Sequence, residues 1–102
     1  MNYISPTTEQ VAKIAERLRV TASDKVNDEI AELIGAACVD MQRQGVDIIN
    51  LADPLTWQAA VLYCKAHYGY DNNTDRFEDA YLVLTAAMSL CGDYDDSEGG
   101  DG

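Results

Sequence analysis

The sequence predicts an all-α fold, a compact bundle of about four helices followed by a disordered acidic C-terminal tail. Three observations predict it. Apolar residues recur at intervals of three and four in four segments, and helix-capping residues bound these segments. Strand signals are nearly absent, since only residues 46–51 resemble an extended segment. The 102 residues provide for one domain, which we expect over residues 1–92, with the tail over residues 93–102.

The first helix is expected over residues 8–19. Thr7 and Gln10 have the spacing of a capping box, in which each side chain binds the backbone N–H of the other residue. Charged residues occupy the positions between the apolar ones, so this helix would bury a single face. That face would consist of Val11, Ile14, Ala15 and Leu18.

The second helix is expected over residues 24–44. Ser23 or Asp24 supplies the side chain that caps its start. Gly45 supplies the left-handed residue that commonly follows a helix end. Its apolar stripe would consist of Val26, Ile30, Leu33, Ile34, Ala37 and Met41.

The third helix is expected to begin at Asp53 and Pro54 and to end at Gly69. Aspartate caps a helix, and proline suits the first position because its missing N–H would have no partner there. Apolar residues surround most of this helix. A helix of this kind is usually central or lies between partners, so we expect it in the middle of the bundle.

The fourth helix is expected from about Asp75 to Cys91, after a loop at residues 70–73 and before Gly92. Its apolar residues again recur at helical spacing. They predict a buried face made of Phe77, Tyr81, Leu84, Ala87, Met88 and Cys91.

The chain is strongly acidic, with 18 Asp and Glu against 7 Lys and Arg and a net charge of −11. Five of the acidic residues lie in the predicted tail: Asp93, Asp95, Asp96, Glu98 and Asp101. Binding to nucleic acid or to an anionic membrane requires clustered cations, and the seven cations here are scattered. No run of about 18 apolar residues is present to span a bilayer. We therefore expect neither tight DNA binding nor a membrane partner.

The three cysteines, Cys38, Cys64 and Cys91, are expected to be small hydrophobic residues of the core. Their number is odd and they lie 26 and 27 residues apart, which fits neither a disulfide framework nor a metal pair. The N-terminal residues lack the basic and then apolar pattern of a secretion signal. The expected compartment is a reducing cytoplasm.

No pattern of catalytic or metal-binding residues is evident, and we expect no enzyme, no metal and no cofactor. His67 is the one histidine, and a Cys64–His67 pair would lack an orienting group and an oxyanion donor. Residues 71–75 have oxygen ligands at three positions of an EF-hand loop. However, Arg76 replaces the required glycine and Leu82 replaces the bidentate glutamate, so helix capping explains this loop better.

A longer pattern lies across the third and fourth predicted helices. Residues 63–71 read Tyr-x-Lys-Ala-x-aromatic-Gly-Tyr-Asp, and residues 76–84 read Arg-Phe-x-x-x-Tyr-x-x-Leu. This pattern resembles the second half of the small helical head–tail connector (adaptor) proteins of tailed bacteriophages. The common plan covers about 90 residues and excludes the tail. The chain departs from the pattern at His67-Tyr68, where a polar–Phe pair is usual, and in its longer Gly- and Asp-rich ending.

The resemblance implies a structural role in the virion neck. Such proteins bind as a homo-oligomeric ring beneath the portal protein, extend the channel for double-stranded DNA and dock a stopper or tail-completion protein. The free chain would be a monomer in the host bacterial cytoplasm until the portal templates the ring. DNA would pass without specific binding, because an acidic lumen repels phosphates.

The resemblance and the excess apolar area of the third helix together indicate a candidate subunit or portal interface. Its members would be Leu55, Leu62, Tyr63, Lys65, Tyr70, Asp71 and Arg76. The alternative for the apolar members is that they complete a small core, with Tyr63, Tyr68 and Tyr81 as aromatic residues at its rim.

A second hypothesis from another class stays open. A charge of −11 in a short chain also fits an acidic DNA mimic that inhibits a host nucleic-acid enzyme. Such a mimic should present its carboxylates in a row resembling phosphates. In this sequence, carboxylates outside the tail alternate with cations such as Lys13, Arg17 and Lys25.

Overall fold

The computed structural model describes residues 6–68 and 74–91, and these residues form four α-helices. In chain order the helices are α1 (Thr8–Leu18), α2 (Asp24–Arg43), α3 (Pro54–Tyr68) and α4 (Thr74–Ser89). The described residues contain no β-strand, so the all-α prediction is confirmed. The tail predicted over residues 93–102 lies outside them.

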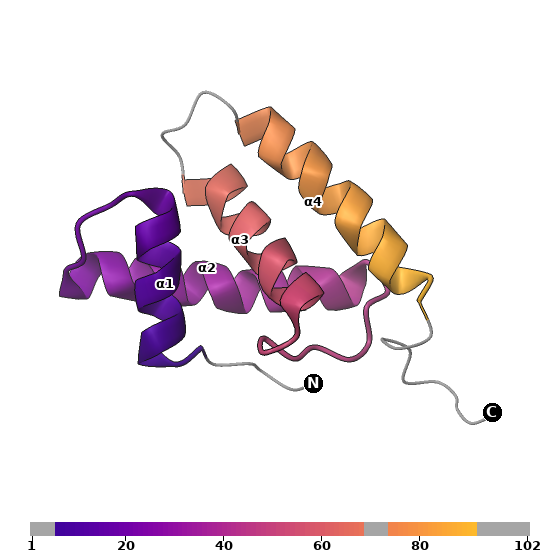
Figure 1. Ribbon diagram of the computed structural model, residues 1–102, viewed down its shortest axis with the longest axis horizontal. Helices are drawn as coiled ribbons and strands as arrows, with labels where there is room; N and C mark the ends of the chain where they lie inside the picture. The colour runs from indigo at the N-terminus through magenta and orange to yellow at the C-terminus, as the bar shows by residue number, and fades with distance from the viewer. Residues whose placement is uncertain (1–5, 69–73, 92–102) are drawn as a thin grey trace.

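Helix α3 is the centre of the bundle, as predicted from the apolar residues on most of its sides. It packs against α1, α2 and α4. Helix α2 runs along the length of the molecule, α1 and α3 cross it, and α4 runs back beside α3 (Figure 1). The α3–α4 hairpin therefore carries the connector-like pattern on two neighbouring helices.

Helix α1 begins with the predicted capping box. The backbone N–H of Thr7 donates to Gln10 Oε1 at 2.9 Å, and the Gln10 N–H donates to Thr7 Oγ1 at 3.1 Å. The helix ends at Leu18, one residue before the predicted end, because Arg19 adopts a left-handed conformation with φ of 60°. This conformation lets the N–H of Val20 reach the carbonyl of Ala15 at 3.2 Å.

Helix α2 is capped by Ser23, whose hydroxyl accepts from the N–H of Val26 at 3.2 Å. Gly45 follows its end with φ of 103°, as predicted. The N–H of Gly45 donates to the Gln42 carbonyl at 3.1 Å, and the N–H of Val46 donates to the Met41 carbonyl at 2.9 Å. These two bonds form a Schellman motif, which satisfies carbonyls that the helix end would otherwise leave without partners.

Helix α3 begins where Asp53 caps it. Asp53 Oδ2 accepts from the backbone N–H groups of Leu55 and Thr56 at 3.1 and 3.0 Å, and from the Thr56 hydroxyl at 3.3 Å. The segment 46–51, which resembled an extended strand, is a connecting loop. Its first and last residues, Val46 and Leu51, are buried and fasten the loop to the core.

All four helices contribute to one hydrophobic core. Its largest fully buried apolar side chains are Ile14, Ile30, Ile34, Met41, Val61, Met88 and Val46. One part of the predicted α4 face is wrong, since Ala87 is exposed and Thr85 is fully buried instead. The hydroxyl of Thr85 donates to the carbonyls of Tyr81 and Leu82 at 3.0 and 3.1 Å. Thr85 can therefore be buried without leaving a polar atom unpaired, which its residue type does not reveal.

Candidate interaction surfaces

The structure separates the seven residues predicted as an interface into three groups. Leu55 and Arg76 are exposed, and Leu62, Tyr63 and Lys65 are half-buried. Tyr70 and Asp71 lie outside the described residues. Of the predicted members that the structure describes, Leu55 and Arg76 are therefore the exposed ones.

Leu55 and Leu62 lie seven positions apart on α3, so they share one face of the helix. Leu55 is 47% exposed near the start of the helix, whereas Leu62 packs against the core. The apolar residues of α3 that the sequence indicated as excess thus have two different surroundings, the core and the solvent. Most of them complete the core, as the alternative held, and Leu55 remains available to a partner.

Tyr63 and Lys65 are engaged within the subunit. The ring of Tyr63 stacks on that of His67 with centroids 4.2 Å apart, and it meets the ring of Tyr81 edge-on at 5.3 Å. Burial, followed by the charge of Asp40, raises the pKa of Tyr63. The Lys65 ammonium lies 5.2 Å from the ring centroid of Phe77, which joins α3 to α4 through a cation–π contact. Both side chains thus support the α3–α4 hairpin.

Among the described residues, three of the five exposed large apolar side chains, Leu82, Val83 and Leu90, lie on α4 or in the turn after it, where the sequence analysis did not place an interface. Val83 is 72% exposed, and Leu90, in the turn after the helix, is 87% exposed. We call this surface the α4 outer face and define it as Ala80, Leu82, Val83, Ala86, Ala87 and Leu90, all of which are exposed. The sequence does contain one signal for this face. Residues 80–92 have no charged side chain, although a quarter of the residues in the whole chain are charged.

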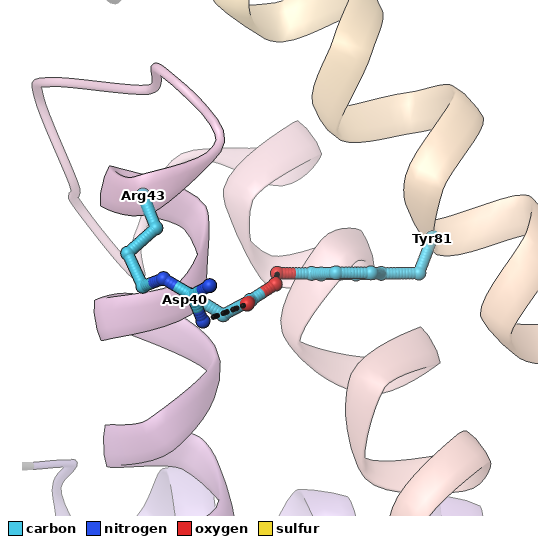
Figure 2. A network of polar contacts seen from close by, with 3 residues as sticks. All are labelled: Asp40, Arg43 and Tyr81. Atoms are coloured by element: carbon cyan, nitrogen blue, oxygen red, sulfur yellow. Dashed lines mark hydrogen bonds and ion pairs between the residues drawn. The ribbon is translucent and has the colours of Figure 1, made fainter.

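A polar network fastens α4 to α2 (Figure 2). The hydroxyl of Tyr81 on α4 donates to Asp40 Oδ2 on α2 at 2.6 Å, and Arg43 Nη1 lies 3.4 Å from the other carboxylate oxygen. Burial raises the pKa of the Tyr81 hydroxyl above its usual value, and the hydrogen bond to Asp40 raises it further. The network therefore keeps Tyr81 protonated at neutral pH, so that its hydroxyl can donate to Asp40 and hold α4 against α2.

The thiols of Cys38 and Cys64 are buried in the core, as predicted, and Cys91 is half-buried. Burial raises the pKa of Cys38 to about 11. Burial and the nearby Cys38 raise the pKa of Cys64 to about 12. Cys64 is thus a protonated, inaccessible thiol at neutral pH, while His67 is exposed and stacked on Tyr63. This arrangement gives Cys64 and His67 packing roles.

Within residues 6–68 and 74–91, no helix has both the length and the hydropathy that crossing a bilayer requires. The same residues bring together no group of three carboxylate, thiol or imidazole side chains with the geometry of a metal site. The EF-hand-like loop at residues 71–75 lies largely outside the described residues.

Comparison of the chain with protein-family models, with curated proteins and with solved structures found no match.

Proposed function

We propose that this chain is a structural subunit of the neck of a tailed bacteriophage. Copies of it would form a ring beneath the portal, extend the DNA channel and dock the next neck or tail component. The observation that carries the proposal is the α4 outer face, an apolar surface on the α3–α4 hairpin that carries the connector-like pattern.

The α4 outer face has the properties of an assembly surface. Val83 and Leu90 are exposed to water in the single chain, although removing such side chains from water is favourable. Contiguous exposed apolar residues usually mark a contact with another molecule. The absence of charged side chains over residues 80–92 also lets a second acidic copy approach this surface without direct repulsion from it.

The charge of the chain supports a channel that DNA traverses. With a net charge of −11, a ring of many copies would hold a large negative charge around its lumen. Phosphates are repelled by such a wall and find no clustered cations to bind. DNA would slide through the ring for this reason. Contacts with other proteins, and not with DNA, would hold the ring in place.

The test mixes the purified full chain with the portal protein of the same phage and measures the assembly by native mass spectrometry. We expect a complex in which several copies bind each portal, while the chain alone stays monomeric. The variant Val83→Glu should weaken this assembly by about tenfold or more, because it places a charge in an apolar contact.

Ala12→Glu is the matched control, since it adds the same charge at an exposed position on α1. It should assemble like the unmodified chain. Both variants should keep the thermal unfolding midpoint of the unmodified chain, because both positions are exposed. Failure of the unmodified chain to bind the portal would contradict the proposed function, and equal assembly of the two variants would contradict the role of the α4 outer face.

A further inference from the structure

We draw no further inference here: the strongest candidate, the groove between α2 and the end of α3 that is lined by Leu33, Tyr68 and the exposed carboxylates of Glu29 and Glu32, places acidic groups beside an apolar wall, and nothing in the structure shows what covers it.

Discussion

Tyr81 connects three parts of the molecule through one side chain. Its ring meets Tyr63 on α3, its hydroxyl donates to Asp40 on α2, and its backbone carbonyl accepts from Thr85 on its own helix. The helical periodicity of α4 predicted that Tyr81 is buried, and the structure confirms it. The partner of its hydroxyl was not predictable, because Asp40 lies 41 positions earlier and reads as a solvent-exposed acid of α2.

The variant Tyr81→Phe should lower the free energy of unfolding by about 1.5–3 kcal/mol, the usual worth of a hydrogen bond to a charged group. Chemical denaturation in urea measures the loss. Tyr63→Phe is the control, because it keeps both ring contacts of the same aromatic cluster and should cost less than about 0.5 kcal/mol. Equal losses in the two variants would contradict the tie between Tyr81 and Asp40.

The pKa of Tyr81 also predicts how stability changes at alkaline pH. Burial and the bond to Asp40 raise this pKa in the folded state above the usual value of 10.0. The folded state therefore holds the proton more tightly than the unfolded state, so the stabilisation is complete below about pH 10 and is lost as pH rises further. Unfolding free energies measured from pH 9 to 11 should fall more steeply for the unmodified chain than for Tyr81→Phe. Parallel curves would contradict this account.

At the scale of elements, local chemistry determines most helix boundaries. Thr7 with Gln10, Ser23, Asp53 and Gly45 were predicted as helix ends, and each makes the expected hydrogen bonds or adopts the expected conformation. These ends were predictable because a cap involves residues at most a few positions apart. The C-terminal ends of α1 and α2 differ in one respect. The residue with the left-handed conformation is Arg19 after α1 and Gly45 after α2.

This difference predicts opposite effects of two substitutions. Gly45→Ala should destabilise the chain by about 1–2 kcal/mol, because a side chain is strained at φ of 103° and the new Cβ would lie 3.2 Å from Ser89 Cβ. Arg19→Gly should stabilise it by about 0.5–1 kcal/mol, because glycine adopts φ of 60° without strain. Thermal or urea unfolding measures both changes. A loss of stability in Arg19→Gly would contradict the reasoning.

Helix α4 shows that helical periodicity predicted a buried face only in part. Its spacing predicted the buried positions Tyr81 and Met88 correctly, but it assigned Ala87 to the core and missed Thr85. Helix α3 and the end of α2 cover one side of α4, and the opposite side is exposed. Small apolar residues on the exposed side look the same in sequence as core residues. The sequence analysis chose Tyr63 and Lys65 for the interface from the resemblance and from the apolar area of the third helix. In the structure both make contacts within the subunit, whereas Val83 and Leu90 are exposed.

At the scale of the whole molecule, the distribution of surfaces matters most. The core is complete within one chain, with α3 at its centre and the thiols of Cys38 and Cys64 protonated and buried. The apolar α4 outer face remains exposed on the outside of this core. In the proposed neck assembly, this face would contact a neighbouring copy or the portal.

The most direct test of the proposed neck role is a cryo-electron microscopy reconstruction of the portal complex from virions of a tailed phage whose genome carries the gene for this chain. The account predicts a closed ring of copies coaxial with the portal. In this ring Val83 and Leu90 would lie in the contacts between copies, and carboxylates would face the lumen. A neck that lacks this chain, or a ring whose lumen is lined by clustered lysine and arginine side chains, would contradict the account.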